Sequence, residues 1–243
     1  MLQMESSPFL QSHFASKAHT YEPNCDPSNL SQETLHHLFR VKRLRVGDLV
    51  SITDGDGRVA LARVEGPLSS ESRGKRGSST SYLVRSGEEY RIISDLPKVE
   101  VALAVIDSDK VDLVVTKLTE LGVSSILLFM AERSNTTHRL GEGRLRLDRL
   151  QKIAIEALSQ SRGCFLPEIS FVEIDFLFDN DFSFLTFDGK EFDPTARKYV
   201  VGPEGGFALS EIPLDVKRCS FAGNVLRSET AAIVASSLAL FYV

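Results

Sequence analysis

The sequence predicts an α/β domain with a mainly parallel sheet, preceded by a smaller β-rich domain. Residues 99–106 (VEVALAVI) and 123–130 (VSSILLFM) are continuous apolar runs, which is typical of strands buried on both faces. Between them, residues 107–122 carry apolar side chains at helical spacing and end at Gly122, a favourable C-cap. Alternating buried strands and helices favour a parallel sheet with helices on both faces.

Three later elements continue this pattern. Residues 147–158 have the apolar spacing of an amphipathic helix, and residues 198–202 (KYVVG) predict a further strand. Residues from 229 to about 242 predict an apolar helix, with Ser228 as its N-cap. Ligands of such sheets bind at the carboxyl ends of the strands, and residues 202–206 lie at one of these ends.

The first 95 residues have a different pattern, with short β-rich runs and turns. Residues 35–64 contain two such runs around residues 54–57 (DGDG), which is a hairpin signal. Residues 66–81 are rich in Ser, Gly and Arg and predict a surface loop, and residues 82–93 predict a second β region. We therefore expect two domains, residues 1–95 and residues 96–243.

Composition excludes several classes of protein. The chain has 243 residues, a net charge of −5 and 42% hydrophobic residues, which is typical of a globular protein and does not indicate a broadly basic nucleic-acid binder. We find no apolar stretch long enough for a membrane span and no signal peptide. Its three cysteines are far apart, which argues against a disulfide framework or a zinc site. These features predict a cytoplasmic protein without a metal.

A glycine-rich segment, residues 201–207 (VGPEGGF), follows the strand that ends near Val201. It matches neither the P-loop pattern nor the dinucleotide fingerprint, and Glu204 would repel a phosphate. The segment therefore suits either a ligand without phosphate, held by backbone groups, or a structural turn. A second segment, residues 223–235 (GNVLRSETAAIVA), begins a helix, and helix capping does not explain its Arg227.

These two segments together, G-P-E-G-G-F followed by L-R-x-E-T-A, resemble the RsmE family. Its members methylate N3 of a uridine in 16S ribosomal RNA and belong to the SPOUT class, which uses S-adenosylmethionine. Asn224 departs from the arginine usual in this family, and residues 66–81 resemble an insertion. Further segments that resemble the family are residues 36–48 (HHLFRVKRLRVGD), 117–126 (KLTELGVSSI), 132–134 (ERS) and 152–169 (KIAIEALSQSRGCFLPEI).

The resemblance implies a SPOUT-type trefoil knot in the second domain and a PUA-like β-barrel that binds RNA in the first. It implies a homodimer that acts on 16S ribosomal RNA or the small ribosomal subunit. The RNA-binding residues would be Arg40, Lys42, Arg43, Arg45, Arg133 and Arg162. The residues that bind S-adenosylmethionine would be Phe129, Met130, Gly202, Pro203, Glu204, Gly205, Gly206, Asn224, Val225, Leu226, Arg227 and Thr230.

Methyl transfer to uridine N3 needs loss of the N3 proton and alignment of the reacting atoms. Arg227, Glu204 and Arg133 are the catalytic candidates: an arginine could stabilise the uracil anion, and a glutamate could act as a base. Glu229 is a base or a helix-capping residue.

Two other functions stay open at this stage. The first is a catalytically inactive RNA-binding or ribosome-assembly protein of the same fold, suggested by Asn224. The second is an unrelated α/β enzyme that binds a nucleotide, which the missing phosphate motifs disfavour.

Overall fold

The computed structural model describes residues 8–66, 82–87, 89–134, 142–208, 210–221 and 223–242. Contacts divide the chain into two compact units. The first consists of Met1–Asp95 and Leu158–Phe165, and the second of Leu96–Ala157 and Leu166–Val243. The surface loop predicted at residues 66–81 lies, after Gly66, outside the described residues.

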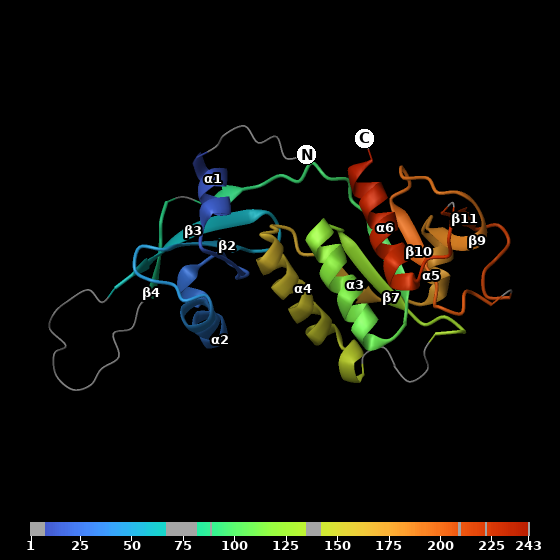
Figure 1. Cartoon of the computed structure of the whole chain (residues 1–243), viewed down its shortest axis with the longest axis horizontal. Helices are drawn as coiled ribbons and strands as arrows, with labels where there is room; N and C mark the ends of the chain where they lie inside the picture. The colour runs from blue at the N-terminus through green and yellow to red at the C-terminus, as the bar shows by residue number, and fades with distance from the viewer. Residues whose placement is uncertain are drawn as a thin grey trace. The chain divides into compact units, whose positions relative to one another are not determined.

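The second unit contains a six-stranded sheet in the order β11-β9-β10-β6-β7-β8 (Figure 1). Every described pairing in this sheet is parallel, which confirms the predicted sheet type. Because β8 and β9 follow one another in the chain but lie far apart in the sheet, the chain crosses to the other half of the sheet between them. The strands are β6 (Glu100–Ala104), β7 (Ser125–Phe129), β8 (Glu168–Phe171), β9 (Ser183–Glu191), β10 (Lys198–Val201) and β11 (Lys217–Ser220).

Helices cover both faces of this sheet, as the sequence predicts. Along β6, Val101 and Leu103 join one buried cluster with residues of α3, α4 and α6, and α3 packs beside α6 (Figure 1). The alternate residues Ala102 and Ala104 join a second cluster, which includes Leu177 of α5. The helical segments are α3 (Ser108–Leu121), η3 (Gly143–Leu145), α4 (Leu147–Ser161), α5 (Ile174–Asp179) and α6 (Ser228–Phe241).

The ends of two helices test the predicted caps. Gly122 has φ = 90° and its N–H bonds the carbonyl groups of Leu118 and Thr119, so the predicted C-cap of α3 is confirmed. Ser228 is not the N-cap of α6, because it is already helical and Arg227 occupies the extended cap position.

No helix of the described residues is both long and apolar enough to span a bilayer.

The first unit contains a smaller sheet, in which β1 pairs with β2 in parallel and the remaining pairs are antiparallel. The hairpin predicted at residues 54–57 is confirmed, since it joins β2 to β3. The elements are α1 (Pro8–Ala15), β1 (Ala18–Tyr21), η1 (Pro27–Asn29), α2 (Gln32–His36), η2 (His37–Val41), β2 (Leu49–Thr53), β3 (Arg58–Glu65), β4 (Tyr82–Arg85) and β5 (Tyr90–Arg91).

The prediction of strands and turns from residue 35 onward is wrong for its first residues. Residues 32–41 are helical, and His36 and His37 therefore lie on helical turns. The physical reason is a local cap, because the Ser31 hydroxyl accepts a 3.0 Å hydrogen bond from the Thr34 N–H.

The segment Leu158–Phe165 packs with the first unit, although the sequence predicts a boundary at residue 95. The Arg162 guanidinium donates hydrogen bonds to the His13 carbonyl (3.0 Å) and to the Ser16 hydroxyl (2.7 Å) and carbonyl (2.5 Å). The His19 ring lies 2.8 Å from the Gly163 carbonyl oxygen. The turn after α4 is thus tied to α1 and β1 of the first unit.

Candidate active site

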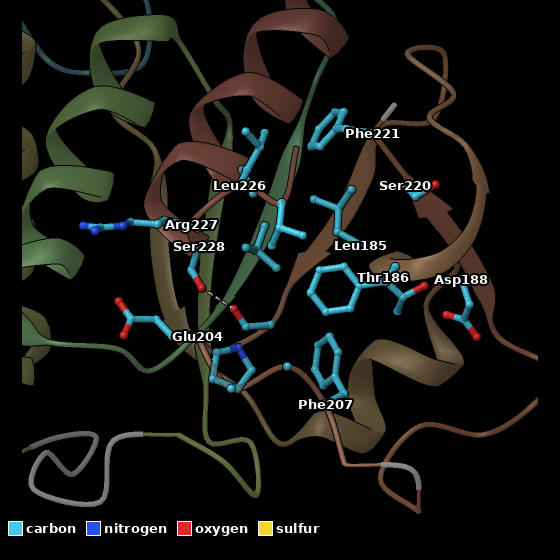
Figure 2. A pocket seen from close by; sticks show the side chains of 18 of the residues that line it. Leu185, Thr186, Asp188, Glu204, Phe207, Ser220, Phe221, Leu226, Arg227 and Ser228 are labelled. Carbon is cyan, nitrogen blue, oxygen red and sulfur yellow. Dashed lines mark hydrogen bonds between the residues drawn. The ribbon is translucent and has the colours of Figure 1, made fainter. Parts of the chain in front are cut away.

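A pocket of about 1170 Å³ opens at the carboxyl end of β10 and beside the middle of β9 in the second unit (Figure 2). Most of its wall comes from residues 185–188 in the middle of β9 and from the glycine loop, which we define as residues 202–208. Residues 220, 221 and 223–228, from the end of β11 to the start of α6, contribute further to the wall. The pocket therefore lies where parallel sheets place their ligands, and it includes both segments that the sequence singles out.

Glycine is required in the glycine loop for two separate reasons. A Cβ at position 202 would lie 2.7 Å from the Phe207 ring, which is too close for any larger residue without a shift of that ring. Gly206 has φ = +67°, in the region that only glycine adopts freely. The loop turns tightly, because the Gly206 N–H donates to the Pro203 carbonyl at 2.8 Å.

The start of α6 is joined directly to the glycine loop. The Ser228 hydroxyl donates a 2.7 Å hydrogen bond to the Gly202 carbonyl, as Figure 2 shows. The Ser228 hydroxyl, which the sequence predicts to cap the helix, therefore bonds the glycine loop. Arg227 is exposed, and in Figure 2 its side chain extends away from Leu185 and Thr186.

Two cations hold the glycine loop from neighbouring strand ends. The Lys110 ammonium, on α3, forms an ion pair with the Glu204 carboxylate. The hydrogen bond to Glu204, the largest cause, raises the pKa of Lys110 above its usual range, although burial acts against it. The Arg133 guanidinium, after β7, donates to the Gly205 carbonyl at 3.0 Å. Two of the three predicted catalytic residues, Glu204 and Arg133, are thus bonded within the protein.

The pocket combines an apolar wall with polar groups. Leu185, Phe207, Phe221 and Leu226 are partly buried around it (Figure 2). Their arrangement suits a flat apolar ring. Polar groups come from Thr186, Asp188 and Ser220 and from the backbone of the glycine loop.

Comparison with protein-family models matches residues 94–240 to the RNA methyltransferase domain. The chain belongs to the RNA methyltransferase domain family. Residues 30–71 match the RNA methyltransferase PUA domain. The sequence motifs indicate a resemblance to the RsmE family. This resemblance is confirmed by relatives whose name, ribosomal RNA small subunit methyltransferase E, is the full name of that family.

Two such relatives are called ribosomal RNA small subunit methyltransferase E. The Borreliella burgdorferi protein, number 2 of that name, is 27% identical over 85% of this chain and 86% of its own length. The Rickettsia conorii protein is 28% identical over 84% of this chain and 85% of its own.

Solved structures show the same fold. A methyltransferase from Legionella pneumophila, in complex with the cofactor S-adenosylmethionine, has a TM-score of 0.74 and 24% identity, and covers 91% of this chain and 96% of its own. Ribosomal RNA small subunit methyltransferase E from Neisseria gonorrhoeae, bound to S-adenosylmethionine, has a TM-score of 0.69 and 21% identity. That match covers 90% of this chain and 95% of the other.

Within the methyltransferase domain, the structure brings together most of the predicted cofactor-binding residues. Those that line the pocket are Gly202, Pro203, Glu204, Gly205, Gly206, Asn224, Val225, Leu226 and Arg227. Three others do not line it. Phe129 is fully buried in the second core cluster, Met130 follows it with its side chain partly exposed, and Thr230 is an exposed residue of α6.

The predicted RNA-binding residues fall into three groups. Arg40, Lys42, Arg43 and Arg45 lie together after α2 in the first unit, and three of them are exposed, whereas Lys42 is half-buried. Arg133 lines the pocket of the methyltransferase domain. Arg162 is bonded to the N-terminal segment of the first unit, which gives it a structural role.

Sequence reasoning missed the contribution of β9 and the role of Lys110. Leu185, Thr186 and Asp188 line the pocket, but β9 is not predicted, since its apolar first half is short and its second half is polar. The sequence motifs assign Lys110 no role in the site. The signal that could have found Lys110 is its position after the carboxyl end of the buried strand β6, where parallel sheets place functional residues.

Proposed function

We propose that this protein is an S-adenosylmethionine-dependent methyltransferase that methylates N3 of a uridine in 16S ribosomal RNA of the small subunit. The observation that carries this proposal is the pocket, whose walls are the glycine loop and the start of α6 in an RNA methyltransferase domain. The names of the relatives and the cofactor in two similar structures support it.

The residues of the pocket fit S-adenosylmethionine. Leu185, Phe207 and Leu226 offer apolar surface for an adenine ring, and the glycine loop brings backbone groups to the same wall. Asp188, on the same wall, could accept hydrogen bonds from ribose hydroxyls. When bound, this cofactor supplies a methyl group that is activated by a sulfonium sulfur.

The contacts of the three catalytic candidates favour different roles. The Arg227 guanidinium is exposed at the pocket and has no hydrogen-bond partner among the described residues, so it is available to stabilise negative charge on the uracil oxygens. Glu204 already binds Lys110, and Arg133 binds the Gly205 carbonyl. We therefore assign charge stabilisation to Arg227 and positioning to the other two.

A methyl-transfer assay tests this proposal. Small ribosomal subunits that lack the modification are incubated with the protein and labelled S-adenosylmethionine, and the nucleosides are then separated. We expect label in 3-methyluridine, and loss of most of it in Arg227→Ala. Arg146→Ala is the matched control, because Arg146 is an exposed arginine of the same unit that is paired with Asp148.

The outcomes separate the candidate functions. Labelled 3-methyluridine with Arg146→Ala and its loss with Arg227→Ala support the enzyme. Binding of S-adenosylmethionine without methylation of any RNA would support the inactive RNA-binding or ribosome-assembly protein that Asn224 suggests. Label in another nucleoside would refute the assignment to uridine N3.

Finer features of the fold belong to the same proposal. We propose a trefoil knot in residues 96–243, supported by the crossing order of the strands and by the Ser228–Gly202 bond between the start of α6 and the glycine loop. We propose a PUA-like barrel in residues 1–95, a homodimer, and phosphate binding by the basic residues after α2. A crystal structure and sedimentation velocity would test the first three, and the salt dependence of RNA binding the fourth.

A further inference from the structure

We propose that Lys110 is a positioning residue that holds Glu204, and through it the glycine loop, in the shape that receives the cofactor. Glu204 is then a structural counter-ion and not the base that removes the uridine proton. This inference rests on the proposed function for the identity of the cofactor, but the loop can be tested without any ligand.

Lys110 stands where helix electrostatics disfavour a cation. It lies in the first turn of α3, where the helix dipole favours acidic residues. Its presence there needs another source of stabilisation, and the surrounding carboxylates provide it. The ammonium is paired with Glu204 and lies 3.8 Å from the Asp107 carboxylate.

A third carboxylate adds to this negative surrounding. One oxygen of Glu229, in the first turn of α6, is buried and has no hydrogen-bond partner among the described residues. Its charge acts on the Lys110 ammonium in the same direction as those of Glu204 and Asp107. Loss of the lysine charge would therefore leave three carboxylates without their common cation.

Further bonds anchor the loop from the segment after β7. Arg133 donates to the Gly205 carbonyl at 3.0 Å. The Glu211 carboxylate accepts from the Ala208 N–H at 3.1 Å and also from the Glu132 N–H. Glycine backbone is intrinsically flexible, so a loop with three glycines needs such anchors if it is to be preorganised for a ligand.

Positioning and general-base catalysis predict different kinetics for Glu204. If its carboxylate removed a proton, Glu204→Gln would lower kcat and change the acidic limb of the pH profile. If it only fixes the loop, the same change weakens cofactor binding and raises KM for the cofactor. The kcat at saturation and its pH profile then stay near those of the unaltered protein.

Charge exchange provides the decisive test. Titration calorimetry of the full chain with S-adenosylmethionine should show about tenfold weaker binding for Lys110→Glu and for Glu204→Lys. The double variant, which restores the pair in reverse, should recover most of this loss, and Lys110→Arg should bind nearly normally. Lys117→Glu is the control, because Lys117 forms an exposed ion pair with Glu120 on the same helix.

Hydrogen exchange of the ligand-free chain tests the loop independently of the cofactor. Amides of residues 202–208 should exchange faster in Lys110→Glu, and the double variant should restore protection. Unchanged exchange in Lys110→Glu, or a double variant no better than the single ones, would overturn the proposal. If exchange behaves as expected but no variant binds S-adenosylmethionine, the proposed function fails while the role of Lys110 in the loop stands.

Discussion

His19 should make the first unit less stable in mild acid. The imidazole is buried, with one ring nitrogen 2.7 Å from the Ser51 hydroxyl and the other 2.8 Å from the Gly163 carbonyl. The neutral ring satisfies both contacts by donating to the carbonyl and accepting from the hydroxyl. Burial first, and then the nearby charges of His13 and Arg162, lower the pKa of His19 to about 4, although the Gly163 carbonyl favours protonation.

The sign and size of the effect follow from proton linkage. The unfolded chain, with a histidine pKa near 6.5, binds the proton more readily than the native chain. The contribution of neutral His19 to the free energy of unfolding is therefore complete above about pH 7 and is lost as the pH falls toward 4. Between pH 7 and pH 5 the free energy of unfolding should fall by about 2 kcal/mol through His19 alone.

Two measurements check this value. Urea unfolding followed by circular dichroism at pH 7 and pH 5, which suits a chain without tryptophan, should show a smaller pH effect in His19→Gln. The variant keeps an amide donor for the Gly163 carbonyl but does not titrate. His36→Gln, a change at an exposed helical histidine, is the control. A His19 resonance that titrates near pH 6.5 in NMR, or equal pH effects in both proteins, would refute the reasoning.

Three further predictions concern binding and stability. Gly202→Ala should weaken binding of S-adenosylmethionine about tenfold in calorimetry, because the new methyl group displaces the Phe207 ring. Unchanged affinity would contradict the proposal that the glycine loop and Phe207 bind this cofactor. Arg162→Met should lower the free energy of unfolding by about 2 kcal/mol in urea, since the His13 carbonyl loses a charged donor; a neutral effect would show that the contact is dispensable. Leu118→Ala, in the core of the second unit, should cost about 3 kcal/mol in the same assay, and a loss below 1 kcal/mol would indicate a loosely packed core.

The buried strands of the second unit were predictable because packing makes them apolar on both faces. The runs at β6, β7 and β10 show this directly. In contrast, β11 contains one apolar residue in the sequence Lys217–Ser220, and pairing with β9 at the sheet edge makes it a strand. Such edge strands depend on partners distant in the chain, which local patterns do not reveal.

The candidate site was predictable where its chemistry depends on backbone shape. The glycines of the glycine loop mark places where a side chain would collide or a positive φ is needed, and both conditions are met. The pair of Lys110 and Glu204 was not predictable, because the residues lie 94 positions apart and meet only through the strand order. Phe129 shows the opposite error. The sequence predicts that it binds the cofactor because it lies at the end of a strand, but its side chain packs into the core.

The segment Leu158–Phe165 has a consequence for the order in which the chain is synthesised. The first unit includes these residues, yet they leave the ribosome after most of α4 and two of the six described strands of the second unit, β6 and β7, have been made. At roughly 5–20 residues per second, the nascent first unit spends several seconds with His13, His19 and Gly57 lacking their later partners. A nascent chain stalled before residue 158 should therefore remain a substrate for chaperones, and one extended beyond residue 165 should be released.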